Sequence, residues 1–179
     1  MYYYLKNGGL PITADVYSGK SRRAFIIKVS GSVDAYLREN DIMLGWSKAE
    51  GLLDESLTRD EFREIVHQQY FSKDDNYRRS GQIAGDLWRF IREMNIGNYV
   101  LVPTEGGYYI GQIVGPARYE EMRIYNDTAY RRKVKWLNGK NPVPMEKTTD
   151  EIKKKLRSPK VVIDASEILQ EIEFSLRIS

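Results

Sequence analysis

Residues 85–115 constrain the fold more than any other part of the chain, because they predict a helix that runs directly into a two-stranded hairpin. Four apolar residues fall on one face of the expected helix: Leu87, Phe90, Ile91 and Met94. Gly97 stands where a helix commonly ends in a left-handed residue. Two β-branched and aromatic runs follow, YVLVP and YYIGQIV, joined by a Thr-Glu-Gly-Gly turn typical of a short hairpin. This antiparallel signal disfavours a doubly wound α/β fold.

Several more short elements are predicted on either side of this segment. Apolar runs indicate strands at residues 24–29, 42–46, 130–137 and 160–163, and a further strand just before an Asn126-Asp127 turn. Helices are expected at residues 33–39, 58–70, 148–157 and 167–176. Five or six short strands, with helices between the second and third, predict an α+β fold: a curved β-barrel of mostly antiparallel strands with helices packed outside.

Three of the expected helices carry a capping signal at their start. Thr58 and Glu61 have the spacing of a capping box, and so do Thr148 and Glu151. Ser80 is the candidate N-cap of the helix that precedes the hairpin.

The 179 residues have the length of a single domain with small appendages. Residues 1–23 are interrupted by glycine and proline and predict an N-terminal arm. Residues 24–146 contain the expected barrel. Residues 147–179 form a helix-strand-helix extension, expected to pack on the domain or lead out of it.

Composition narrows the classes of protein and site. No apolar run approaches the roughly 18–20 residues that span a bilayer, and the N-terminus lacks a signal-peptide pattern, so no membrane partner is expected. The absence of cysteine fits a cytoplasmic protein without disulfides. With a single histidine as well, a zinc site is disfavoured, and neither a metal nor another cofactor is expected.

The sequence predicts no enzyme. It contains no nucleophile elbow, no phosphate loop and no HExxH motif. Ser47 and Lys48 lack supporting groups for nucleophilic catalysis. Asp127 with Glu151 and Lys153 matches the loose D…ExK pattern of metal-dependent nucleases. In a polar helix, however, Glu and Lys two residues apart point to different faces, so we interpret this match as coincidental.

Basic residues gather in clusters, two of which are interleaved with aromatic residues. Guanidinium groups bind phosphates and aromatic faces stack on bases, so this combination is typical of a nucleic-acid surface. The predicted phosphate-binding residues are Arg78, Arg79, Arg131, Arg132 and Lys133. The lysine-rich run at residues 153–157 lacks aromatic neighbours, and we assign it to a solvated helix face.

The three tryptophans have different predicted places. Trp88 lies near the apolar face of its helix, where core packing is expected. Val134 and Trp136 share one face of their strand, and that face is expected to point inward. Trp46 ends a strand before a small polar loop, which favours a ring at the edge of a pocket. His67, in an otherwise ordinary helix, is expected at the surface or partly packed.

The order of these segments resembles the PUA-like superfamily. The resemblance runs from about residue 22 to residue 137 and is carried by AFIIKVSGSVDAYLRENDIMLGW, SGQIAGDLWRFIREMNIGNYVLVP, YYIGQIVG and YRRKVKWL. It is closest to the EVE-like and YTH-like modules of modification-dependent restriction systems of the McrB and Mrr kinds. Asn98 stands where those modules usually have an acidic residue.

The resemblance implies a barrel with a concave aromatic pocket that accepts a flipped and often modified base. Trp46 and Ser47 match the edge of that pocket by position. Four further residues are candidates by chemistry alone: Tyr108, Tyr109, Tyr125 and Trp136.

We therefore expect a non-catalytic module that binds nucleic acid, above all duplex DNA with methylated bases, for a restriction or defence system. Any nuclease or NTPase activity would belong to another domain or subunit. Two alternatives stay open from the sequence: an RNA-binding PUA-like protein, and a protein-interaction or oligomerisation domain that uses its aromatic residues as an interface. A small-molecule enzyme is the least favoured interpretation of the four, because acid-base groups are few.

Overall fold

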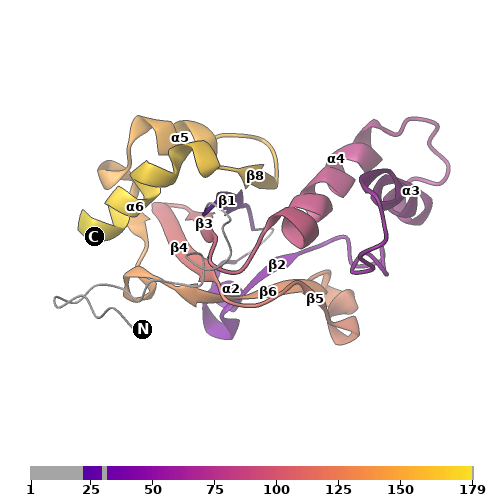
Figure 1. Cartoon of the computed structure of the whole chain (residues 1–179), viewed down its shortest axis with the longest axis horizontal. Coiled ribbons are helices and arrows are strands. Elements are labelled where there is room, and N and C mark those ends of the chain that lie inside the picture. Colours follow the sequence, from indigo (N-terminus) through magenta and orange to yellow (C-terminus); the bar gives the residue numbers. More distant parts are fainter. Residues whose placement is uncertain (1–21, 30–31, 179) are drawn as a thin grey trace, which may run out of the picture.

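A computed structural model describes residues 22–29 and 32–178 (Figure 1). The fold is α+β, with one mixed sheet that curls into a half-barrel and helices packed around it. The strands are β1 (Ala24–Ile27), β2 (Asp41–Leu44), β3 (Tyr99–Thr104), β4 (Gly107–Ile113), β5 (Arg118–Tyr119), β6 (Tyr130–Trp136), β7 (Val143–Pro144) and β8 (Val162–Asp164). The helices of at least six residues are α2 (Asp34–Glu39), α3 (Arg59–Tyr70), α4 (Arg78–Trp88), a 3-10 helix (Glu121–Asn126), α5 (Asp150–Leu156) and α6 (Leu169–Ile178).

The sheet has the order β2-β6-β4-β3-β1-β8, with β5 on β6 and β7 on β4. β1 and β3 are parallel, and the other pairs are antiparallel. The predicted hairpin is confirmed as β3 and β4, in which Val102 pairs with Tyr109 and Thr104 with Gly107. Gly97 has the expected left-handed backbone, with φ of 94°.

β1 is buried on both faces, as its continuous apolar sequence predicts. Phe25 and Ile27 belong to the core cluster that includes residues of α3 and α4. Ala24 and Ile26 belong to a second cluster, formed with α5, β8 and α6. The sheet therefore has a hydrophobic core on each side at this point, and the two helix groups lie apart in Figure 1.

The C-terminal segment completes the sheet. β8 pairs with β1 in antiparallel register, with Ile26 opposite Ile163. Arg22, at the end of the predicted N-terminal arm, donates a hydrogen bond to the Tyr99 hydroxyl at 2.8 Å and pairs with Glu173 of α6. Residues 1–21 of that arm lie outside the described residues.

Two of the three capping predictions are wrong. The Thr58–Glu61 capping box is present. Ser80, however, lies inside α4 and is buried. Its hydroxyl is 2.8 Å from Nδ1 of His67 and so is engaged with another helix instead of capping its own. His67 is itself buried rather than at the surface. The last capped helix starts one residue later than expected: Thr149 caps α5, while the Thr148 hydroxyl donates to the Pro144 carbonyl.

The strand predicted before Asn126 is mostly absent. Only Arg118–Tyr119 pairs with β6, as β5, and the chain then forms the 3-10 helix. The predicted turn remains, because Asp127 adopts the left-handed conformation at the end of that helix. The alternation in β6 holds as expected: Val134 and Trp136 are buried, while Lys133 and Lys135 are exposed.

Candidate functional site

A groove of about 680 Å³ lies between α4, the start of α3 and the segment that leads into β8. We call it the basic groove, because the described residues that line it include five cationic side chains: Arg59, Arg78, Arg79, Arg89 and Lys160. Asp86 is the acidic residue in this lining, and Trp46 contributes an indole ring. Residues that are far apart in the sequence thus converge on one hollow.

Most of these cations are not neutralised by carboxylates. Arg89 pairs with Asp86 at 3.6 Å, one turn earlier on the same helix. Within the part of the chain that the structure describes, no carboxylate forms an ion pair with the other four cations, Arg59, Arg78, Arg79 and Lys160. The Arg79 guanidinium lies over the Phe71 ring, 4.8 Å from its centre, which holds the side chain without removing its charge.

Two glycines shape the helix face on which the arginines lie. Gly81 and Gly85 are four residues apart, so they share one side of α4. A Cβ at Gly85 would stand 3.3 Å from Nη2 of Arg59 and 3.5 Å from Nη1 of Arg89. A Cβ at Gly81 would meet only the Arg63 chain, at 3.8 Å. The absence of a side chain at the buried Gly85 therefore lets the two guanidinium groups lie close to the helix backbone.

Asp86 connects α4 to the strand beside it. Its Oδ1 accepts a hydrogen bond from the backbone N–H of Val162 at 3.2 Å. Burial raises the pKa of the Asp86 carboxyl, against the lowering effects of this hydrogen bond and of the Arg89 and Lys160 charges. Asp86 thus holds the two sides of the groove together, and burial disfavours its negative charge.

Trp46 has a left-handed backbone with φ of 65°, a conformation that bulky residues rarely adopt. Its ring packs edge-on against Tyr70, with the ring centres 5.2 Å apart. Non-glycine residues in this region cost about 1–3 kcal/mol, and they persist where the surroundings dictate the backbone. The hydrogen bonds of the next residue supply that constraint.

Ser47 fixes the loop through three hydrogen bonds. Its backbone N–H donates to Asp127 Oδ1 at 2.8 Å, and its hydroxyl accepts from the Ala129 N–H at 3.0 Å. The Tyr119 hydroxyl donates to the Ser47 carbonyl at 2.7 Å. Gly45 is needed beside them, because a Cβ there would stand 2.6 Å from Asp127 Oδ2. Ser47 and Asp127 therefore position Trp46 rather than line a pocket.

The other predicted pocket residues do not gather around Trp46. Tyr108 is fully buried in the second core cluster, with its hydroxyl 3.1 Å from that of Ser175. Trp136 is buried and donates from Nε1 to the Tyr36 carbonyl at 3.2 Å. Tyr109 packs against the Trp136 ring, and Tyr125 is 82% exposed on the 3-10 helix. Of the six residues predicted for a base pocket, the basic groove contains Trp46.

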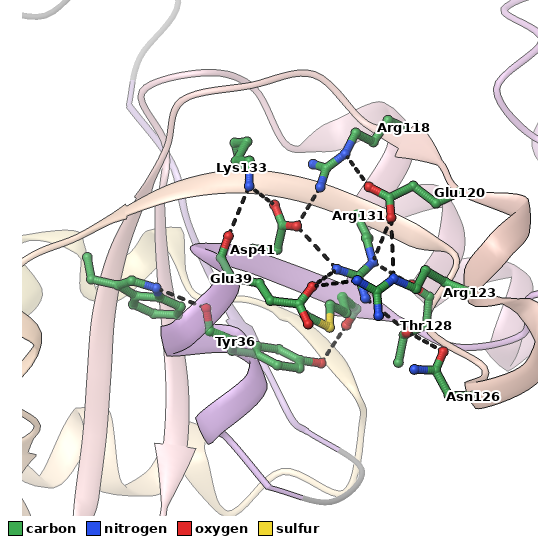
Figure 2. A network of polar contacts seen from close by, with 12 residues as sticks. Tyr36, Glu39, Asp41, Arg118, Glu120, Arg123, Asn126, Thr128, Arg131 and Lys133 are labelled. Atoms are coloured by element: carbon green, nitrogen blue, oxygen red, sulfur yellow. Dashed lines mark hydrogen bonds and ion pairs between the residues drawn. The ribbon is translucent and has the colours of Figure 1, made fainter.

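The predicted phosphate-binding residues divide in two. Arg78 and Arg79 line the basic groove. Arg131 is 1% exposed and pairs with Glu39, Asp41 and Glu120, as Figure 2 shows. Lys133 lies in the same network, 3.4 Å from Asp41 and 2.9 Å from the Glu39 carbonyl oxygen. The charges of Arg131 and Lys133 are thus engaged in contacts within the fold, and neither residue lines the basic groove.

Arg132 is also buried, and backbone carbonyls surround it. Its guanidinium donates to Phe90, Ile91 and Met94 at 2.8–3.0 Å, and to Gly115 at 3.2 Å. The first three carbonyls end the helix formed by α4 and its π-helical last turn, Arg89–Glu93. Burial lowers the pKa of Arg132 to about 10, so the group stays charged near neutral pH. Arg132 thus caps a helix end instead of binding a phosphate.

The sequence patterns do not reveal two residues of the groove, Arg59 and Lys160. Arg59 follows the Thr58 cap, and Lys160 stands alone beside Pro159, so neither belongs to an aromatic-flanked cluster. Only the tertiary fold brings them to α4. The residues of the coincidental nuclease match are also separated in space: Asp127 bonds to Ser47, while Glu151 is exposed on the first turn of α5.

No group of three or more metal-ligating side chains occurs among residues 22–29 and 32–178. Within the same ranges, no helix has the length and apolarity needed to cross a bilayer.

Comparison with known families gives one match. A family model described as "Domain of unknown function (DUF8426)" matches residues 29–158, most of the 179-residue chain, and the chain belongs to that family. No curated protein and no solved structure matches the chain. The matched stretch contains Trp46 and the four arginines of the basic groove.

Proposed function

We propose that this member of the DUF8426 family is a nucleic-acid-binding module, and that the basic groove is its binding site. The observation that carries the proposal is that four cations, none of which forms an ion pair with a carboxylate among the described residues, converge on one groove that also presents a tryptophan ring. Arginine forks match phosphate oxygens, and an aromatic face stacks on any base. The groove cations differ in this respect from Arg131 and Arg132, which are buried and stabilise the fold.

We further propose that the curled half-barrel is PUA-like and that the ligand is DNA with a modified base, read for a restriction or defence system in the cytoplasm. The resemblance in sequence supports this narrower proposal. The strained and braced Trp46 loop supports it as well, because rigid placement of a ring is what selective stacking needs. Trp46 contributes an aromatic ring to the lining of the groove, so we propose that this ring stacks on one face of the nucleobase while arginines bind the flanking phosphates.

The test is a binding panel measured by fluorescence anisotropy at low salt, where phosphate contacts are strongest. The probes are duplexes with methylcytosine, hydroxymethylcytosine, methyladenine or no modification, and a single-stranded RNA of the same sequence. Arg78→Gln with Arg79→Gln should weaken binding to all probes and reduce the salt slope by about 2, because each arginine would neutralise one phosphate. Lys135→Gln is the control: it removes one positive charge at an exposed position of β6, outside the groove, and should have little effect on affinity or salt slope.

Trp46→Ala separates base reading from phosphate binding. We expect it to lose about 1–3 kcal/mol of affinity and most of the preference between probes, while the salt slope stays unchanged. Stronger binding of single-stranded RNA than of every duplex would replace DNA by RNA as the ligand. A stable dimer that binds none of the probes at low salt would overturn the proposal and favour a protein-interaction domain.

A further inference from the structure

A second hollow, of about 450 Å³, lies next to the basic groove. Its lining includes Arg89 and Lys160, which also line the groove, so the two hollows meet at these side chains. On the far side it is bounded by α5, which contributes Lys154 and Lys155. In Figure 1, β8 lies between α5 and the C-terminal end of α4.

Two of the three acidic residues that line the second hollow, Asp164 and Glu167, have cationic partners. Glu167 pairs with Lys155 at 2.6 Å. Asp164 pairs with Arg23 and accepts from the Ser166 hydroxyl at 2.6 Å. Ser166 and Arg23, with burial acting in the opposite direction, keep the pKa of Asp164 below its ordinary value. Glu151 is exposed at the start of α5.

The lysines at this end of the hollow differ in whether a carboxylate pairs with them. Lys154 is exposed and, like Lys160, forms no ion pair with a carboxylate among the described residues. Lys153, the preceding residue, does not line the hollow and stands 4.0 Å from Asp150. The helix therefore directs one unpaired lysine to the joined hollows and keeps its neighbour outside them.

We infer that the site binds an extended polynucleotide strand, which continues from the basic groove across Arg89 and Lys160 to Lys154 on α5. This inference rests on the proposed function. It assigns to the lysine-rich helix a contact with the ligand, where the sequence pattern indicated only a solvated face. A single nucleotide would occupy only one hollow, whereas a strand of several nucleotides reaches both.

The experiment compares short and long oligonucleotides on the full chain. Single strands from about 2 to about 16 nucleotides, the range over which nucleic-acid grooves typically bind, are titrated at two or more salt concentrations. Wild-type affinity should rise with length beyond the shortest probes. Lys154→Gln should reduce the salt slope by about 1 for the long probes and leave the short probes unchanged.

Lys153→Gln removes the same charge from the same helix and should leave every titration at the wild-type value. Both positions are on α5 and outside the core clusters, so neither change should unfold the protein. If the wild type binds long probes but Lys154→Gln and Lys153→Gln have the same affinities and salt slopes, the contact of the strand with α5 is refuted. The basic groove then remains the proposed site. If affinity does not depend on length, a single-nucleotide site replaces the strand. If the wild type binds the duplexes of the first panel but none of these single strands, the strand inference is refuted and the proposed function remains. If it binds neither, the proposed function itself fails.

Discussion

At the scale of single residues, the most consequential side chain for stability is Arg132. Its guanidinium satisfies four buried carbonyl oxygens, three of them at the end of the helix that leads into β3. Arg132→Leu leaves these carbonyls without donors, and each buried unsatisfied group costs about 1–3 kcal/mol. We expect the free energy of unfolding to fall by about 3 kcal/mol or more in urea titrations.

Lys135→Leu is the matched control for this prediction, since Lys135 is exposed on the same strand. Its effect should be within about 0.5 kcal/mol. Equal stabilities of the two variants would show that solvent or rearranged backbone replaces the donors of Arg132.

The second prediction at this scale concerns Asp127, which braces the Trp46 loop without lining the groove. Asp127→Ala removes a negative charge, and long-range electrostatics alone predict tighter binding of a polyanion. Loss of the acceptor for the Ser47 N–H instead releases the strained Trp46 backbone. We expect the second effect to prevail, with binding about fivefold weaker, the lower range of one base–aromatic stack.

Asp127→Asn distinguishes the two effects, because it keeps the acceptor oxygen and loses the charge. Anisotropy titrations should give this variant an affinity equal to or above that of the wild type. Tighter binding by Asp127→Ala would contradict a positioning role for Asp127.

At the scale of elements, α4 supplies the floor of the basic groove through Gly81 and Gly85. Gly81→Leu fills the groove without changing any charge, and its Cβ has room. Glycine inside a helix is less stable than leucine by about 0.5–1 kcal/mol, so thermal unfolding should occur at a higher temperature. Binding of nucleic acid should nevertheless weaken at least about tenfold, corresponding to about 1.4 kcal/mol.

Gln69→Leu serves as the control for Gly81→Leu, since it adds an apolar side chain at an exposed site of α3 outside the groove. Its binding should match that of the wild type. A more stable Gly81→Leu variant with unchanged affinity would place the ligand elsewhere on the molecule.

The ion-pair network between α2, β2 and β6 predicts a pH dependence (Figure 2). The hydrogen bond from Arg131 holds the pKa of the Glu39 carboxyl below its ordinary value of 4.5. A carboxyl with a lowered folded pKa stabilises the protein above the unfolded pKa, and this stabilisation is lost as the pH falls through the folded value. Urea titrations should therefore show weaker stability below about pH 4.5, and Glu39→Gln should flatten that decline. Glu146→Gln, at an exposed carboxylate, should leave the slope unchanged.

Local sequence patterns predict those elements whose cause is local. The β3–β4 hairpin, the two-sided burial of β1 and the Thr58 capping box all follow from residues close together in the chain. Ser80 shows where such patterns stop being sufficient. Its sequence position suits a helix cap, but a partner on another helix, His67, determines its place.

The candidate site follows the same division. The sequence singles out Trp46, Arg78 and Arg79, because a polar loop and a basic run are visible in it, and the structure brings these three residues to one groove. Arg131 and Arg132 belong to an equally basic run, yet the fold buries them. The difference lies in carboxylates and carbonyls supplied by distant segments, such as Glu39 and Phe90, which no local pattern reveals.

At the scale of the whole molecule, the folding unit extends past the region that defines the family. The family match ends at residue 158, before β8 and α6. β8 covers the edge of β1, and the stretch from β8 into α6 supplies five buried apolar residues: Val162, Ile163, Ala165, Ile168 and Ile172. An uncovered β1 would be an apolar edge strand, which favours aggregation. The C-terminal segment is therefore structural as well as a contributor of Lys160 to the groove.

Deletion of residues 159–179 tests this point. Removing five buried apolar residues costs several kcal/mol, comparable to the roughly 5–15 kcal/mol that stabilises a typical domain. We expect the truncated chain to be largely insoluble, and any soluble fraction to lack a cooperative thermal transition by circular dichroism. Deletion of residues 177–179 alone should preserve that transition, because the described residues it removes, Arg177 and Ile178, belong to neither hydrophobic core cluster. A cooperative transition in the longer deletion would show that residues up to 158 fold independently, and that β8 and α6 were added to a complete core.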